Sequence, residues 1–231
     1  MMSEPTLLLL HGAGTGAWVW ERLAGKLATP AVALNVPGRV EGATPGGCAI
    51  AIVSELERCT TNGEVVAVLH SLAGVLAPGL ALCLGPRLKR FVFVSAVIPP
   101  SGRAFVDGIG LMNKLLLRTF FKLKPRGLRH SPSMIRRSMC NDLDPKTADE
   151  VISRYAAEMP GLYLTAAGNC PAGLDSTYVK LLKDQSLPVR QQEAMIARLD
   201  SPKVRALEAG HLAMLSDPVG LARILDEEAR L

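Results

Sequence analysis

The chain has 231 residues, of which 48% are hydrophobic and 20% are charged. This length allows one domain with a sizeable core, and the composition is that of a globular rather than a disordered protein. The net charge of +5 arises from a basic stretch between residues 103 and 137. Aromatic residues make up only 4%, and no nucleic-acid-binding module is recognisable. We therefore interpret the basic stretch as a solvated helical face and expect no nucleic-acid partner.

The cysteines and the apolar runs indicate the cellular compartment of the protein. Its five cysteines are scattered and form neither a CxxC pair nor a Cys/His cluster. This pattern favours reduced thiols over a disulfide framework or a zinc site. No apolar run is long enough to cross a bilayer, and residues 7–10 lack the basic leader of a signal peptide. We expect a cytoplasmic protein with no stable membrane insertion and no bound metal.

Short apolar runs alternate with helical patterns through the first part of the chain. Strands are predicted at residues 6–10, 31–34, 65–69 and 88–94, and helices at residues 17–28, 48–58 and 72–84. A glycine-rich turn at residues 11–16 follows the first strand. This spacing predicts right-handed strand–helix–strand units and a mostly parallel sheet with helices on both faces.

The alternation stops after residue 98 and resumes near residue 171. Residues 99–170 are predicted to be a helical insertion, with a helix at residues 145–159 that Asp144 caps. Beyond the insertion, strands are predicted at residues 177–182 and 204–207, and helices at residues 188–199 and 218–229. We therefore predict an α/β fold whose core comprises residues 1–98 and 171–231, with residues 99–170 as a helical cap.

Ser71 stands where the third predicted strand gives way to a helical pattern. His70 precedes the serine, and the helical pattern begins at Leu72. A sharp strand-to-helix turn can hold a serine hydroxyl above a sheet as a nucleophile. Serine is also a common helix N-cap, so the local sequence leaves both interpretations open.

Two residues that could activate a serine follow later strands. Asp184 and His211 come after the strands predicted at residues 177–182 and 204–207. A serine hydroxyl needs an imidazole to accept its proton, and the imidazole needs a carboxylate to fix its tautomer. Sites of parallel sheets gather beyond the carboxyl ends of the strands, so we expect these residues to converge on Ser71. Asp175 and Asp200 are alternative acids, but only Asp184 follows a strand directly.

Four stretches carry a family resemblance: residues 10–20, 70–74, 91–99 and 210–218. With them the chain resembles the α/β-hydrolases, whose catalytic residues also occur in the order serine, acid, histidine. Within that superfamily it is similar to the group of plant methylesterases and hydroxynitrile lyases. The resemblance covers the predicted core, whereas the insertion matches weakly.

The resemblance implies a serine hydrolase and assigns roles to particular residues. Ser71 would be the nucleophile, His211 the general base and then acid, and Asp184 the carboxylate that orients the histidine. The backbone N–H groups of Ala13 and Leu72 would form the oxyanion hole. The implied reaction is hydrolysis of a small-to-medium apolar ester or thioester through an acyl-enzyme, with no cofactor.

The candidate substrate contacts lie beside these residues or among the apolar residues of the insertion, where most ligand pockets find their lining. They are Gly12, His70, Phe105, Met112, Phe120 and Leu212. The expected partner is a small-molecule ester, and the resemblance suggests a homodimer.

Two departures from the family pattern bear on activity. The nucleophile turn usually has glycine two residues before and two residues after the serine, whereas this chain has Leu69 and Ala73. A bulky Leu69 could compromise the turn, so a weak or inactive ligand-binding protein of the same fold is the alternative function. Hydroxynitrile lyases of this group carry a lysine directly after the catalytic histidine. This chain has Leu212 there, which favours ester hydrolysis over cyanogenesis.

Overall fold

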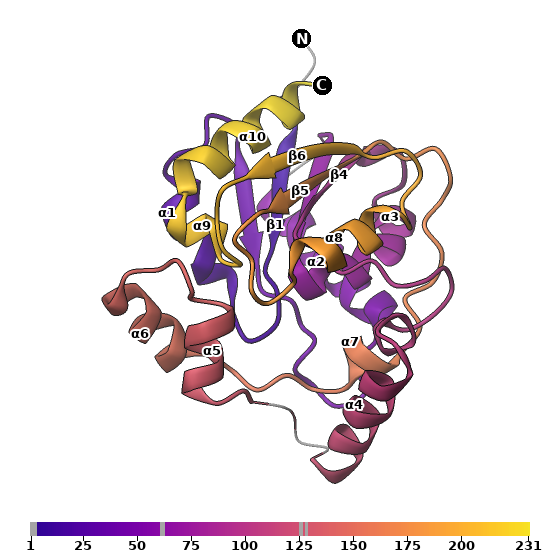
Figure 1. Ribbon diagram of the computed structural model, residues 1–231. Helices are drawn as coiled ribbons and strands as arrows, with labels where there is room; N and C mark the ends of the chain where they lie inside the picture. The colour runs from indigo at the N-terminus through magenta and orange to yellow at the C-terminus, as the bar shows by residue number, and fades with distance from the viewer. Residues whose placement is uncertain (1–3, 61–62, 125–126, 128) are drawn as a thin grey trace.

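A six-stranded sheet forms the centre of the molecule in the computed structural model, which describes residues 4–60, 63–124, 127 and 129–231. The strands are β1 (Thr6–Leu10), β2 (Ala31–Leu34), β3 (Val65–His70), β4 (Leu88–Val94), β5 (Ser176–Leu181) and β6 (Lys203–Leu207). They lie in the order β2-β1-β3-β4-β5-β6, and every neighbouring pair is parallel (Figure 1). The predicted parallel α/β sheet is confirmed.

Helices cover both faces of the sheet, as the chain turns back between successive strands. The elements that connect or follow the strands are the short 3-10 helices η1 (Ala17–Trp20), η2 (Ser71–Leu76) and η3 (Gly85–Arg87), and the helices α1 (Glu21–Ala24), α2 (Pro45–Cys59), α3 (Ala77–Leu84), α8 (Val189–Ile196), α9 (Ala213–Ser216) and α10 (Pro218–Arg230).

The alternating side chains of the strands divide the core into two layers. In β1, Leu8 and Leu10 pack into the layer that also contains residues of α2 and α3. Leu7 and Leu9 point to the other face and pack into the layer formed with α1, α9 and α10 (Figure 1). All four leucines are fully buried, because a strand covered on both faces must be apolar at every position.

Two predicted helices differ from the observed ones for local reasons. The helix predicted at residues 17–28 is a 3-10 turn followed by the single turn α1, which ends before Gly25, a residue that disfavours helix. The helix predicted from Leu72 runs as 3-10 turns as far as Leu76, and regular α-helix begins only at α3. Pro78 lacks the N–H that an α-helix spanning this junction would need to donate to Gly74.

Between β4 and β5 the chain leaves the sheet and forms a separate set of helices. These are η4 (Phe105–Gly108), α4 (Leu111–Leu123), α5 (Pro132–Ser138), α6 (Pro145–Arg154) and α7 (Gly161–Leu164). A helix was predicted at residues 145–159, but α6 ends at Arg154 because Tyr155 adopts an extended conformation. In Figure 1 this segment hangs below the carboxyl ends of the strands, with α5 and α6 on one side and α4 and α7 on the other. Across the described residues, no helix combines the length and apolarity that a membrane span requires.

Candidate functional site

Ser71 occupies a sharp turn at the carboxyl end of β3. Its φ of 52° lies in the left-handed region, which non-glycine residues adopt rarely and mostly where the surroundings enforce it. The chain can make this turn because Gly12 and Gly74 allow close approaches. A Cβ on Gly12 would lie 2.6 Å from the Ser71 Cβ, and one on Gly74 would lie 2.2 Å from the Val97 carbonyl oxygen.

Leu69 does not prevent this turn. It remains in β3, aligned with Leu10 of β1 and Phe93 of β4, and its side chain is fully buried in the core. Gly74, three residues after the serine, is a crowded position of this turn, and Ala73 is buried in the core. The leucine that replaces the usual glycine at position 69 therefore packs in the core without disrupting the turn.

His211 and Asp184 form a buried pair. Their side chains are 3% and 0% exposed, and the His211 Nδ1 lies 2.7 Å from the Asp184 Oδ2. Asp184 also accepts hydrogen bonds from the Ser95 hydroxyl at 2.7 Å and from the backbone N–H groups of Ser186 at 2.7 Å and Leu187 at 2.8 Å. Burial alone would raise the pKa of Asp184, but the charge of His211 and these hydrogen bonds outweigh it, and the pKa is lowered.

The pairing with Asp184 fixes the tautomer of His211. An ionised carboxylate only accepts hydrogen bonds, so in the neutral form of the ring Nδ1 carries the proton and Nε2 keeps its lone pair. His211 and Ser71 both line one cavity of about 350 Å³. Of the aspartates considered from the sequence, Asp184 contacts this histidine. Asp175 and Asp200 precede their strands and line a different pocket.

The backbone N–H groups of Ala13 and Leu72 lie beside Ser71, and hydrogen bonds to the preceding carbonyls fix their direction. The Gly12 carbonyl accepts hydrogen bonds from His11 Nδ1 at 2.8 Å and from the Thr15 hydroxyl at 3.1 Å. In a planar trans peptide the next N–H, that of Ala13, points the opposite way. The Ser71 carbonyl likewise accepts from the Val97 N–H at 2.8 Å, which turns the N–H of Leu72 away. Ala13 and Leu72 both line the cavity that holds Ser71.

The loop after β1 is held from both sides, and sequence reasoning missed the outer support. The inner support is His11, whose Nε2 accepts from the Val36 N–H at 3.0 Å; burial lowers the pKa of His11 to about 4. The outer support comes from the segment between α6 and α7. Glu158 accepts from the Gly14 N–H at 2.7 Å, and the Gly14 carbonyl accepts from the Ala156 N–H at 2.9 Å.

Glu158 also forms an ion pair with Arg39. The Arg39 Nε and Nη2 lie 2.8 and 2.6 Å from the same carboxylate oxygen, and the Glu158 side chain is 6% exposed. Burial raises the pKa of Glu158, although Arg39 and the Gly14 N–H oppose that shift. This pair joins residues 119 positions apart, so no local sequence pattern could have identified it.

His70 lies behind His211 rather than on the cavity wall. It is fully buried, and its Nε2 donates to the His211 carbonyl at 2.9 Å. Its Nδ1 has no partner in the described structure. Burial, and then the charge of His211, lowers the pKa of His70 to about 3, so the ring is neutral at physiological pH.

The predicted substrate contacts divide into two groups. Phe105 lines the cavity, and Gly12 lines a small pocket that shares Ala13 and Leu72 with it. Met112 and Phe120 were expected at the site but lie on α4, outside the described lining of the cavity, with Met112 exposed to solvent. Leu212 is fully buried in the core and also lies outside that lining.

Residues that the sequence did not single out complete the wall of the cavity. Most are apolar or aromatic and come from the segment between β4 and β5: Val97, Ile109, Met134, Met139, Tyr155 and Tyr163. His130 also lines the cavity and is half-buried. Within the described part of the chain, no group of three or more His, Cys, Asp or Glu residues is placed to hold a metal ion.

A second cavity, of about 280 Å³, lies apart from Ser71. It is lined by Gly74, Phe91, Phe93, Cys170 and Arg198 among others. Of the residues that the sequence singled out for chemistry, its lining includes Asp200, whereas His211 is paired with Asp184 in the other cavity. The candidate site is therefore the cavity around Ser71.

Known proteins resemble the chain along nearly its whole length. Residues 7–224 match the family model described as the alpha/beta hydrolase family. The pimeloyl-[acyl-carrier protein] methyl ester esterase of Aromatoleum aromaticum is 29% identical, over 99% of this chain and 100% of that protein. Methylesterase 10 of Arabidopsis thaliana is 25% identical, over 96% of this chain and 90% of that protein.

Solved structures share the fold. An extracellular alpha/beta-hydrolase from a Paenibacillus species superposes with a TM-score of 0.85 at 15% identity, covering 96% of this chain and 98% of that one. A methylesterase from Arabidopsis superposes with a TM-score of 0.75 at 19% identity, covering 98% and 99%. With the family model matching nearly the entire chain, this protein belongs to the α/β-hydrolase family and is a hydrolytic enzyme.

Proposed function

We propose that this hydrolase is a carboxylesterase that cleaves a small-to-medium apolar ester, or thioester, through an acyl-enzyme. The observation that carries the proposal is the buried pair of His211 and Asp184, which shares a cavity with a serine held at positive φ. The names of two relatives, a methyl ester esterase and a methylesterase, support ester hydrolysis.

In the proposed reaction, the Ser71 Oγ attacks the ester carbonyl carbon while His211 Nε2 takes the hydroxyl proton. Asp184 keeps the Nδ1 proton in place and stabilises the imidazolium that forms. The N–H groups of Ala13 and Leu72 donate to the oxyanion. The intermediate collapses, the C–O bond to the leaving group breaks, and His211 returns the proton to the departing alcohol. Water, activated by the same imidazole, then hydrolyses the acyl-enzyme and regenerates Ser71.

The cavity favours an apolar acyl group or alcohol. Its volume of about 350 Å³ lies at the lower end of the range for small-molecule sites. Phe105, Ile109, Met134 and Met139 contribute apolar walls. We propose that residues 99–170, which supply most of these side chains, act as a cap over a core formed by residues 1–98 and 171–231.

Labelling with a fluorophosphonate tests whether Ser71 is a nucleophile. The reagent should modify the native protein and the control Ser54→Ala, which changes an exposed serine of α2. It should not modify Ser71→Ala, whose melting temperature should confirm that the variant is folded. Absence of labelling in the folded native protein would instead favour the alternative, a ligand-binding protein of the same fold.

A chain-length series of p-nitrophenyl esters tests the substrate class. We expect turnover to peak at a short or medium acyl chain, because the cavity is apolar but small. No turnover of any member of the series would contradict the proposed substrate class. A cyanohydrin assayed in parallel addresses the hydroxynitrile lyase alternative, which Leu212 disfavours.

The location and assembly of the protein stay predictions. All five cysteines are unpaired in the structure, with Cys48 and Cys140 buried. The cytoplasmic location was predicted from the sequence pattern of these cysteines, and the homodimer was suggested by the family resemblance. Cell fractionation and sedimentation velocity, respectively, would test the two predictions.

A further inference from the structure

Helix α4 exposes an unusually apolar surface. Five of its large apolar side chains are between 53% and 75% exposed: Leu111, Met112, Leu115, Leu116 and Leu123. In the described part of the chain, no other helix or strand carries more than one such side chain. Exposed apolar side chains are normal when scattered singly, whereas a contiguous group of them marks an interaction surface.

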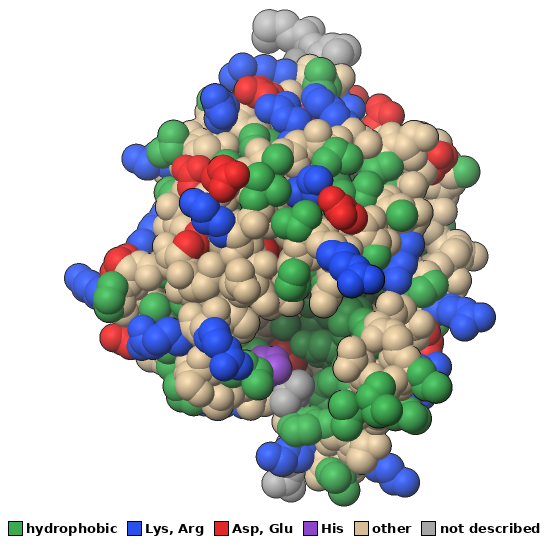
Figure 2. Space-filling view, viewed as in Figure 1, with side chains coloured by type: hydrophobic (Ala, Val, Ile, Leu, Met, Phe, Trp, Pro, Cys, Tyr) green, Lys and Arg blue, Asp and Glu red, His purple; other side chains and the backbone are tan. Residues whose placement is uncertain are grey.

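The exposed side chains lie on one face of α4. Leu111 and Leu115 are four residues apart and form one row, and Met112, Leu116 and Leu123 form the row beside it. The opposite face is anchored by Phe121, which is buried and packs against Tyr163 of α7 with ring centroids 5.3 Å apart. The apolar rows therefore point away from the body of the protein, where Figure 2 shows green side chains over this helix.

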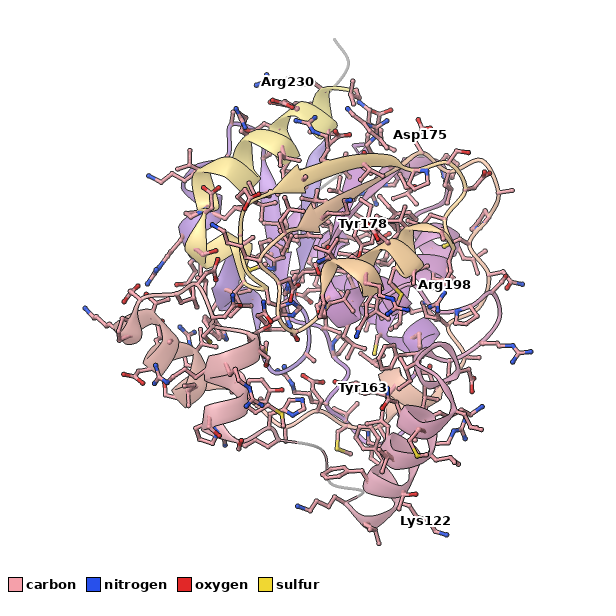
Figure 3. The ribbon with its side chains drawn as sticks, viewed as in Figure 1. Lys122, Tyr163, Asp175, Tyr178, Arg198 and Arg230 are labelled. Carbon is pink, nitrogen blue, oxygen red and sulfur yellow. The ribbon has the colours of Figure 1, made fainter. Side chains whose placement is uncertain are left out.

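Cations border this apolar face along one edge, where Lys114, Arg118 and Lys122 follow one another at four-residue spacing. Lys122 lies toward the end of α4 that is farthest from the sheet (Figure 3). Lys114 and Arg118 share the carboxylate of Asp107, at 2.8 and 3.4 Å. Lys122 and Lys124 have no carboxylate within 4 Å in the described structure; the Lys124 Nζ lies 5.4 Å from the ring centroid of Phe120. The helix therefore carries a net positive charge beside its apolar rows (Figure 2).

We infer that α4 docks the protein peripherally on an anionic lipid bilayer. A helix with one apolar face and flanking lysine and arginine residues lies in the plane of the membrane interface, with its apolar side chains between the headgroups and its cations on the anionic phosphates. At 13 residues, α4 is too short to span the bilayer, so the contact is superficial and reversible.

The charge distribution favours a bilayer over a second copy of the chain. Residues 111–123 include lysine and arginine but no aspartate or glutamate, so a second α4 helix packed on this face would add like charge and offer no carboxylate to these cations. An anionic bilayer supplies phosphates that pair with these cations, and its interface covers the leucines at the same time. Docking would also place the site near the lipid, because Phe121 packs on Tyr163, which lines the cavity that holds Ser71.

Co-sedimentation with vesicles tests the inference without any substrate, so its outcome is independent of the proposed esterase activity. The native protein should bind vesicles of equal parts phosphatidylglycerol and phosphatidylcholine, and added salt should weaken that binding. Vesicles of phosphatidylcholine alone should bind much less. Removal of one cation with Lys122→Gln should weaken binding about fivefold, and removal of one membrane-contacting leucine with Leu115→Ser about tenfold or more.

Matched controls change the same residue types elsewhere. Leu82→Ser alters a leucine of α3 that is 74% exposed, and Lys26→Gln alters an exposed lysine after α1. Both should bind vesicles like the native protein. Three results would overturn the inference: no vesicle binding by the native protein, equal losses in the controls, or a dimer in solution that Leu115→Ser converts to a monomer.

Discussion

The buried, neutral ring of His70 should make the protein less stable in mild acid. Burial lowers its pKa from 6.5 to about 3 in the folded protein. Between these pH values the His70 ring is protonated in the unfolded chain but not in the native state. The free energy of unfolding therefore keeps its full value above about pH 6.5 and falls as the pH drops toward 3. Stability rises with pH over this range because the pKa of this base is lower in the folded protein than in the unfolded chain.

The magnitude follows from the distance between the pKa values. At about pH 5 the unfolded imidazole is almost fully protonated, whereas the native His70 is almost entirely neutral. Each pH unit below 6.5 contributes about 1.4 kcal/mol, so His70 alone accounts for a loss of roughly 2 kcal/mol between about pH 7.5 and pH 5. His11, whose pKa burial lowers to about 4, has an effect of the same sign.

Comparison of the native protein with His70→Gln isolates this contribution. The amide of glutamine keeps a donor for the His211 carbonyl, and the substitution removes the titrating ring. Urea unfolding at the two pH values should show that the variant loses about 2 kcal/mol less stability on acidification than the native protein does. Equal losses would refute the reasoning. The NMR shifts of the His70 ring provide a second measurement and should remain those of a neutral imidazole at about pH 5.

Three further sets of substitutions test other parts of the molecule. Asp184→Asn should lower kcat by about four orders of magnitude, because an amide stabilises neither the required tautomer nor the imidazolium. The exposed Asp175→Asn should leave kcat unchanged, and a small effect of Asp184→Asn would contradict the assigned role. Gly74→Ala should destabilise the protein by about 3 kcal/mol in urea unfolding, since the new Cβ meets the Val97 carbonyl. Gly46→Ala places its Cβ in open space and should not destabilise. Glu158→Gln should destabilise by about 2 kcal/mol, because Arg39 loses its carboxylate. Its combination with Arg39→Met should have less than the summed effect, and simple additivity would show that the pair is not coupled.

The sequence predicted β1 and β3 well because buried strands are continuous apolar runs, whereas the largely exposed edge strand β6 was predicted from the alternation of strands and helices. All six predicted strands occur, and their ends differ from the observed ones by at most one residue. Helix boundaries were less predictable. The ends of α1 and α6 depend on local breaks, and the late start of α3 depends on Pro78, which a pattern of apolar spacing does not take into account. The pairing of Asp184 with His211 was predictable because both residues follow parallel strands at the same edge of the sheet.

The insertion was the least predictable region, because amphipathic spacing locates an apolar face without indicating what covers it. Met112 and Phe120 have the spacing of residues that line a pocket, yet α4 turns its apolar rows outward. Met134 and Tyr163, in short helices without a clear pattern, line the cavity instead. Ser95, which holds Asp184 by a hydrogen bond of 2.7 Å, is a strand-end serine with no distinguishing sequence signal.

The loop after β1 connects the helical segment to the sheet beside Ser71. Gly14 donates to Glu158 and accepts from Ala156, so both sides of its backbone are fixed by the segment between α6 and α7. A Cβ on Gly14 would lie 1.9 Å from the Tyr155 ring, which shows how closely that segment covers the loop. Since Ala13 lies between Gly12 and Gly14, the orientation of its N–H depends on contacts that both parts of the chain provide. Any movement of this segment relative to the sheet would shift the Ala13 N–H, and with it the stabilisation of the oxyanion in the proposed reaction.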